Sequence, residues 1–187
     1  MKKPGFKGLV FKPEDIMSNI IRIDSFHSGD FHKCSNNGPG FRVVVWFSGC
    51  SHNCPGCHNK AEQNPKVGRP FTEEDISFIL TELESSNYRG ISVLGGEPFE
   101  PYNTLDVSTL CKRVKEKFSD KKSIWVWSGS TWDQLKKSED LNVKVILETA
   151  DVLVDGPFIE SKKNLNLRFR GSENQRIINL KTGEIEE

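Results

Sequence analysis

Hydrophobic residues fall into short blocks from about residue 41 onward, and the blocks alternate between strand-like and helix-like patterns. Residues 41–47 (FRVVVWF) are mostly β-branched or aromatic and lie between glycine-containing turns, so they predict a buried strand. Residues 20–23 are a candidate edge strand. Three later blocks predict further strands: residues 91–94, 123–127 and 152–154.

Helical patterns separate these strands. Thr72 precedes three acidic residues and is suited to cap a helix, because its hydroxyl accepts from free backbone amides and the acids favour the positive end of the helix dipole. Residues 131–137 are also compatible with a helix. The apolar stripe after Thr72 consists of Ile76, Ile79, Leu80 and Leu83. A second helix is predicted over residues 105–118, with inward positions at Leu105, Leu110, Val114 and Phe118.

Alternating strands and helices are typical of an α/β fold. We expect one such domain over residues 36–187, with a mostly parallel, curved sheet, preceded by an N-terminal extension over residues 1–35. A closed barrel of eight strand–helix units takes about 250 residues, so this sheet should remain open on one side. The predicted internal strands run into small or acidic residues, and ligands of parallel sheets bind at those carboxyl ends.

Composition narrows the class of protein. Lys and Arg balance Asp and Glu at 26 each, so no overall field favours nucleic acid or anionic lipid. No apolar run approaches the length that spans a bilayer, and the N-terminus lacks the apolar core of a signal peptide. We therefore expect a cytoplasmic protein without a membrane or nucleic-acid partner.

The strongest chemical signal is the run of Cys50, Cys54 and Cys57, with the spacing C-x3-C-x2-C. Three thiolates on so short a segment can hold one iron–sulfur cube and leave one iron without a protein ligand. A structural zinc site that adds His52 or His58 is an alternative which spacing alone does not exclude. The position directly after a predicted strand favours a catalytic metal.

The other two cysteines are Cys34 and Cys111, which are isolated in the sequence. Neither is expected to bind the metal. Cys111 falls within the predicted helix over residues 105–118 and is expected to fill the core.

A second motif, Gly95-Gly96-Glu97-Pro98, follows the strand predicted at residues 91–94. Glycine lets a ligand approach the backbone, and Glu97 could accept hydrogen bonds from a ligand ammonium group. The alternative is a plain strand–helix turn. If a ligand does lie there, a branched side chain at Gly96 should block its binding and spare the metal site.

Together these motifs resemble the radical S-adenosylmethionine enzymes. The segments Gly38-Pro39-Gly40-Phe41-Arg42 and Cys57-His58-Asn59 further resemble the activating enzymes of glycyl-radical proteins. The greatest similarity is to the activases of anaerobic (class III) ribonucleoside-triphosphate reductases, with matching segments at residues 125–129, 151–158 and 170–176. Pro157 and Phe169 depart from that pattern, in which Lys and Trp are expected.

The resemblance implies a chemistry. Three cysteines would hold a 4Fe-4S cluster, and the amino and carboxylate groups of S-adenosyl-L-methionine would chelate the fourth iron. Reductive cleavage would yield a 5′-deoxyadenosyl radical, which would take hydrogen from a glycine of the anaerobic reductase's catalytic subunit. A low-potential electron donor such as flavodoxin or ferredoxin would supply the electron. The implied fold is a shortened radical S-adenosylmethionine partial (β/α) barrel, open on one side.

The resemblance also implies cofactor contacts. The adenosine part would lie near Gly56, Cys57 and His58, and the methionine amino end near Gly95, Gly96 and Glu97. Ser128 and Asp155 are candidates for ribose contacts, and turn or helix-capping roles are equally compatible with them. The segment 170–176 is either a surface hairpin or a docking patch for the partner.

Two alternatives to this function are open at the level of sequence. One is a radical S-adenosylmethionine enzyme that acts on a small molecule, as the short deazapurine synthases do. The other is a zinc-stabilised interaction module without catalysis.

Overall fold

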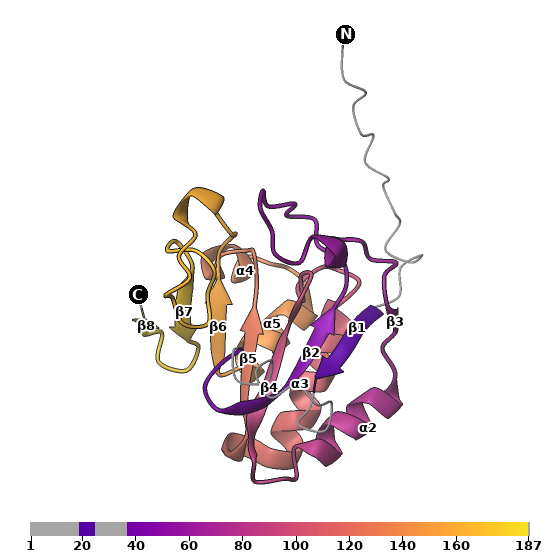
Figure 1. Cartoon of the computed structure of the whole chain (residues 1–187). Coiled ribbons are helices and arrows are strands. Elements are labelled where there is room, and N and C mark those ends of the chain that lie inside the picture. The colour runs from indigo at the N-terminus through magenta and orange to yellow at the C-terminus, as the bar shows by residue number, and fades with distance from the viewer. Residues whose placement is uncertain (1–18, 25–36, 187) are drawn as a thin grey trace.

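In the computed structural model, which describes residues 19–24 and 37–186, eight strands form one mixed sheet. The strands are β1 (Asn19–Asp24), β2 (Phe41–Phe47), β3 (Arg69–Pro70), β4 (Tyr88–Gly95), β5 (Ser123–Trp127), β6 (Val152–Asp155), β7 (Arg176–Asn179) and β8 (Ile185–Glu186). Their order across the sheet is β3-β1-β2-β4-β5-β6-β7-β8 (Figure 1). Among the described strands, β3 and β8 are therefore the two edges of an open sheet.

The parallel part of the sheet is its centre. Strands β2, β4, β5 and β6 pair in parallel, whereas every pairing outside them is antiparallel. The prediction of a mostly parallel sheet is thus corrected to a mixed sheet, because four of its seven strand pairings are antiparallel. Its description as a partial barrel stays a prediction.

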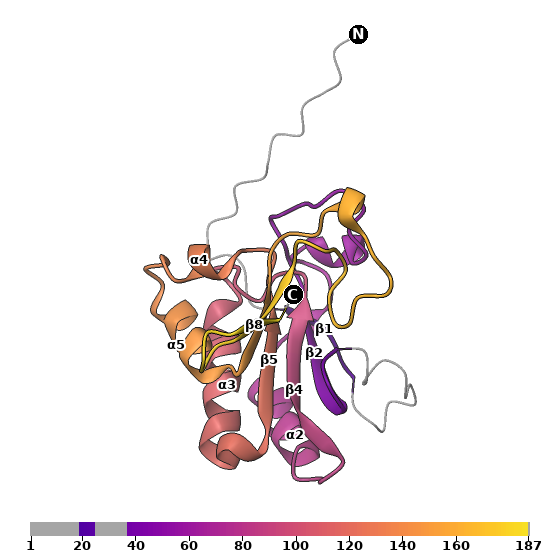
Figure 2. The ribbon, with the colours of Figure 1, turned by 90° about the vertical axis from the view of Figure 1, so that its left-hand side faces the viewer.

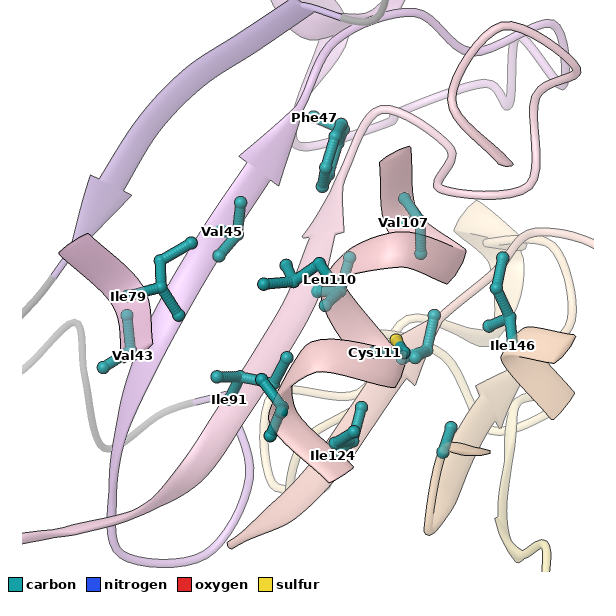
Figure 3. Close-up of a cluster of buried hydrophobic side chains, with 14 of the residues drawn as sticks. Val43, Val45, Phe47, Ile79, Ile91, Val107, Leu110, Cys111, Ile124 and Ile146 are labelled. Carbon is teal, nitrogen blue, oxygen red and sulfur yellow. The ribbon is translucent and has the colours of Figure 1, made fainter. Parts of the chain in front are cut away.

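Helices cover one face of this sheet (Figure 2). They are α2 (Glu73–Glu82), α3 (Thr104–Phe118), α4 (Trp132–Leu135) and α5 (Leu141–Thr149), and three short 3-10 turns are η3 (Lys60–Gln63), η4 (Ser119–Lys121) and η5 (Glu160–Lys162). The main core lies between the sheet and α2, α3 and α5 (Figure 3). Val43, Val45 and Phe47 point into it, whereas Val44 and Trp46 belong to a cluster on the opposite face, as strand periodicity requires.

The predicted start of α2 is confirmed. Thr72 caps the helix, since its hydroxyl accepts from the backbone amide of Asp75 while the Asp75 carboxylate accepts from the amide of Thr72 at 2.9 Å. Arg69 then binds both oxygens of Asp75, and this ion pair holds the pKa of Asp75 below its usual value. Cys111 is fully buried in the core, which confirms its predicted role as core filler.

Three further differences from the sequence predictions concern individual helices and strands. Leu105, predicted to face inward, is 62% exposed, because it lies on the outward face of α3 with the exposed Lys112, while Thr104 and Val107 face the core. Strand β1 contains residues 20–23, which were predicted to form an edge strand. The two-residue strand β3 pairs with its outer side, so β3 and not β1 is the edge. Helix α5 and strands β7 and β8 had no predicted counterpart.

Several sequence predictions lie outside the described residues. They include the role of Cys34 and most of the extension over residues 1–35. Within the described part of the chain, none of the helices combines the length and apolar character needed to cross a bilayer.

Candidate metal and cofactor site

A pocket opens at the carboxyl ends of the parallel strands. Cys50, Cys54 and Cys57 line one side of it, and Gly95 and Gly96 lie at the end of β4. The structure thus brings both sequence motifs to one site, as parallel pairing of β2 and β4 requires.

The later strands complete the pocket. Ser128 and Gly129 follow β5, Gly156 and Phe158 follow β6, and Gln175 precedes β7. Of the other predicted contacts, Gly56 and His58 are exposed beside the cysteines, while Glu97 and Asp155 lie behind the pocket lining. The predicted residues are therefore neighbours, but they do not all face the same space.

The segment with the three cysteines, residues 48–59, is called the cysteine loop below. Its base is fastened by backbone hydrogen bonds in two directions. The amide of Gly49 donates to Glu62 at 2.7 Å, and the carbonyl of Gly49 accepts from the amide of Glu97, also at 2.7 Å. Gly49 has a φ of 87°, and a Cβ there would lie 2.2 Å from the Tyr102 hydroxyl, so only glycine fits this crossing point.

Glu97 is the centre of a hydrogen-bond network behind the pocket. Its side chain accepts from the amide of Phe99 at 3.0 Å, from the amide of Gly129 at 2.8 Å and from the Ser128 hydroxyl at 3.2 Å. Its Oε2 is also 2.9 Å from His52 Nε2, and this hydrogen bond raises the pKa of His52. Glu97 is only 3% exposed.

These contacts give Glu97 a structural task which the sequence did not indicate. It joins the cysteine loop, through His52, to the backbone after β5 at Gly129. The predicted contact of Glu97 with a ligand amino group stays a prediction, although all four present partners compete for the same two oxygens.

Two further residues of the turn after β4 hold the cysteine loop, and sequence reasoning missed both. Glu100 accepts from the backbone amide of Ser51 at 2.6 Å. Asn103 is fully buried and donates to the carbonyls of Ser48 and Glu97. The one signal in the sequence was their nearness to the Gly-Gly-Glu-Pro motif.

Replacing Glu97 by Gln should destabilise the metal-free protein by about 2 kcal/mol, because an amide nitrogen would then face hydrogen-bond donors in a buried position. Urea unfolding of the metal-free chain measures this effect. The matched control is Glu116→Gln on the exposed side of α3, which should leave the midpoint unchanged. Equal midpoints for the Glu97 variant and the unmodified chain would contradict the assigned role.

Asp155 and Ser128 occupy different environments. Asp155 is fully buried, accepts from the amide of Trp132 at 2.6 Å and pairs with Arg176, where its Oδ1 lies 2.9 Å from Nε. These contacts connect the end of β6 to the start of α4 and to β7. They agree with the helix-capping role that was the alternative to a ribose contact for Asp155. Ser128 lines the pocket, so the ribose contact remains a prediction that its position favours.

The donor set suits an iron–sulfur cluster. Thiolates are soft ligands that favour iron–sulfur and zinc sites. Burial, with smaller contributions from Glu97, Glu100 and Cys54, raises the pKa of Cys50 to about 12 in the metal-free chain, so a thiolate there requires nearby positive charge such as iron supplies. In the described ranges, no three His, Cys, Asp or Glu side chains converge on a single ion. A cube needs no such convergence, since each thiolate binds a different iron.

Comparison with known proteins decides the class of cluster. Residues 36–178 match the family described as "4Fe-4S single cluster domain". Proteins named anaerobic ribonucleoside-triphosphate reductase-activating protein share 37% identity in Escherichia coli K12 and 39% in Vibrio cholerae, over 78% and 75% of this chain and 92% and 89% of theirs. The protein of that name from Enterobacteria phage T4 is 36% identical over 75% of this chain and 85% of its own length.

The chain belongs to this family of activating proteins. The spacing of the cysteines had left a zinc site open as an alternative, and the match to a 4Fe-4S domain supports an iron–sulfur cluster instead.

Proposed function

We propose that this protein activates an anaerobic ribonucleoside-triphosphate reductase by generating a glycyl radical on it, with S-adenosyl-L-methionine as the source of the radical. One observation carries the proposal. Cys50, Cys54 and Cys57 line a single open pocket, while Cys111, the other cysteine in the described residues, is buried on the core side of α3. Three ligands for a four-iron cluster leave one iron for a substrate.

A 4Fe-4S cluster held by Cys50, Cys54 and Cys57 would supply one electron to the sulfonium of S-adenosyl-L-methionine, whose carbon–sulfur bond would break to give methionine and a 5′-deoxyadenosyl radical. Transfer of a hydrogen atom from a backbone glycine to that radical would leave 5′-deoxyadenosine and a glycyl radical. A low-potential donor of the flavodoxin or ferredoxin kind would supply a new electron to the cluster.

The protein's own residues would bind and orient the reactants. The cysteine loop would place the cluster against the ends of β4 and β5, and Leu94, Trp127 and Phe158 would supply apolar walls that limit water. Ser128 and the backbone at Gly95, Gly96 and Gly129 lie along the pocket and offer polar groups to the cofactor. Because the pocket is open at the strand ends, a loop of a second protein can enter it.

The test uses electron paramagnetic resonance. Mixed anaerobically with S-adenosyl-L-methionine, a low-potential reductant and the reductase of the same source, the reconstituted protein should produce a doublet from the remaining glycine α-hydrogen. Deuterium at that α-carbon should collapse the doublet. A Cys54→Ala variant serves as the control and should give no signal. Formation of 5′-deoxyadenosine without a radical on the reductase would reject this substrate and favour a small-molecule substrate.

A further inference from the structure

The connection between β6 and β7, residues 156–175, forms one rim of the pocket. Gly156, Phe158 and Gln175 line the pocket from this side. The Glu160 side chain lies against the cysteine loop, since a Cβ on Gly56 would be 2.7 Å from its Cδ. Figures 1 and 2 both show η5 next to the loop that follows β2. A protein bound to this connection would have the cysteines within reach.

Backbone pairing holds the connection in one shape. The amide of Glu173 donates to the carbonyl of Lys162 at 2.9 Å, and the amide of Asn164 donates to Gly171 at 3.2 Å. Ser172 is fully buried, and its hydroxyl accepts from the amide of Ile159 at 3.2 Å. The outer side chains of this segment are therefore presented on a pre-organised support.

Phe169 fastens the far end of the connection to the sheet. Its φ of 61° is in the left-handed region, which is unfavourable for a bulky residue. The conformation lets its ring pack edge-on against Trp125, with centroids 5.5 Å apart, and lets its carbonyl accept from the Trp127 indole at 2.8 Å. The tip between Lys163 and Phe169 thus lies on the side of the sheet that carries no helix (Figure 2).

The arginines that the sequence singled out in this region have internal partners. Arg170 donates to the carbonyl of Gln175 at 2.8 Å, and Arg176 pairs with the buried Asp155. Both therefore stabilise the connection itself. Any docking surface must use their neighbours instead.

Four of those neighbours point outward: Lys162, Lys163, Leu165 and Arg168. Leu165 is 88% exposed, the highest value among the exposed large hydrophobic residues of the described chain. Lys162 and Lys163 form no ion pair with described residues. Two cations of α3 differ in this respect, since Arg113 pairs with Glu73 and Lys117 pairs with Glu84. The acids nearby, Glu160 and Glu173, only partly offset three cations.

We propose that Lys162, Lys163, Leu165 and Arg168 form the docking surface for the protein that carries the target glycine, which would meet them with an acidic surface around an apolar depression. This inference rests on the proposed function. Leu165, the apolar anchor of this surface, favours that partner over the electron donor. Weak electron-transfer encounters use small surfaces, whereas the protein that receives the radical must remain bound while its loop occupies the pocket.

A charge-reversal variant tests the electrostatic part. Lys162→Glu/Lys163→Glu/Arg168→Glu should lower the association rate constant for the reductase at least tenfold at low salt, and the difference from the unmodified protein should shrink as salt rises. The matched control is Lys112→Glu/Lys121→Glu/Lys144→Glu, which makes the same change in net charge on exposed residues of the helical layer. It should stay within twofold of the unmodified protein.

A second variant tests the apolar anchor. Leu165→Ser should speed dissociation of the reductase about tenfold, because an apolar anchor acts mainly on the lifetime of a complex. Leu141→Ser, at the 72% exposed first residue of α5 on the helical side, is its control and should leave dissociation unchanged. Iron content and partner-free formation of 5′-deoxyadenosine should be normal in all four variants, which separates lost docking from lost folding.

Two outcomes would overturn the inference. Unchanged rate constants in both test variants would mean that the surface is merely solvated. A normal affinity for the reductase combined with slower reduction by the electron donor would assign the surface to the donor. Failure of the unmodified protein to form a glycyl radical would instead reject the proposed function, and binding measurements with the purified reductase would still decide the docking question.

Discussion

Alanine in place of any one of Cys50, Cys54 and Cys57 will leave the protein without a stable 4Fe-4S cluster and without detectable cleavage of S-adenosyl-L-methionine. Each thiolate would bind a different iron. The buried groups nearby are engaged elsewhere, since Glu97 and Glu100 accept from backbone amides and Cys111 lies in the core. Iron and acid-labile sulfide after anaerobic reconstitution measure the effect.

Cys111→Ala provides the matched control for this series. It removes a thiol of the same type from the helical core, so it should cost about 1 kcal/mol of unfolding free energy through a small cavity, and iron content should be unchanged. Cys34→Ala should also retain iron. Full iron and sulfide in any of the three cysteine-loop variants would refute the ligand assignment.

Gly96→Ala should have an effect nearly as large, for a reason that only the packed structure reveals. A Cβ on Gly96 would lie 2.2 Å from the carbonyl oxygen of Gly49 and 2.9 Å from that of Glu62. These are backbone atoms at the base of the cysteine loop and cannot turn aside. We expect a loss of at least about 3 kcal/mol in stability, since even ordinary overpacking costs about 1–3 kcal/mol, together with weak cluster retention.

This expectation revises the one drawn from sequence, in which a side chain at Gly96 blocks the ligand and spares the metal site. Gly171→Ala is the control, because its Cβ would first meet a side-chain atom of Phe158 at 3.2 Å, a full ångström farther than the backbone contact at Gly96. Urea unfolding, iron content and calorimetric titration with S-adenosyl-L-methionine compare the two variants. Normal iron with absent cofactor binding in Gly96→Ala would restore the earlier interpretation.

Local patterns were enough to locate most of the fold. The apolar runs at residues 41–47 and 123–127 coincide with β2 and β5, because a strand buried on both faces has to be hydrophobic throughout. Thr72 and its acidic neighbours marked the start of α2, since capping depends on residues only three positions apart. Elements with local signals of this strength are recoverable from sequence, whereas α5, which Asp140 caps, was not predicted.

Elements defined by distant partners were not. Strands β7 and β8 are short, and they become strands by pairing antiparallel with β6 and with each other. The outward position of Leu105 depends on which face of α3 packs against the core. Likewise, β1 is an inner strand only because β3 pairs with it. Hydrophobicity alone carries no information about which strand borders which.

The same division holds for the site. The three cysteines and the Gly-Gly-Glu-Pro turn were recognisable because each motif is continuous, and parallel pairing of β2 with β4 made their proximity predictable. The contacts of Glu97 with His52 and Gly129, and of Glu100 with Ser51, join residues about 30 to 50 positions apart. Such contacts arise from the angle at which loops leave the sheet, so they exist only once the chain is packed.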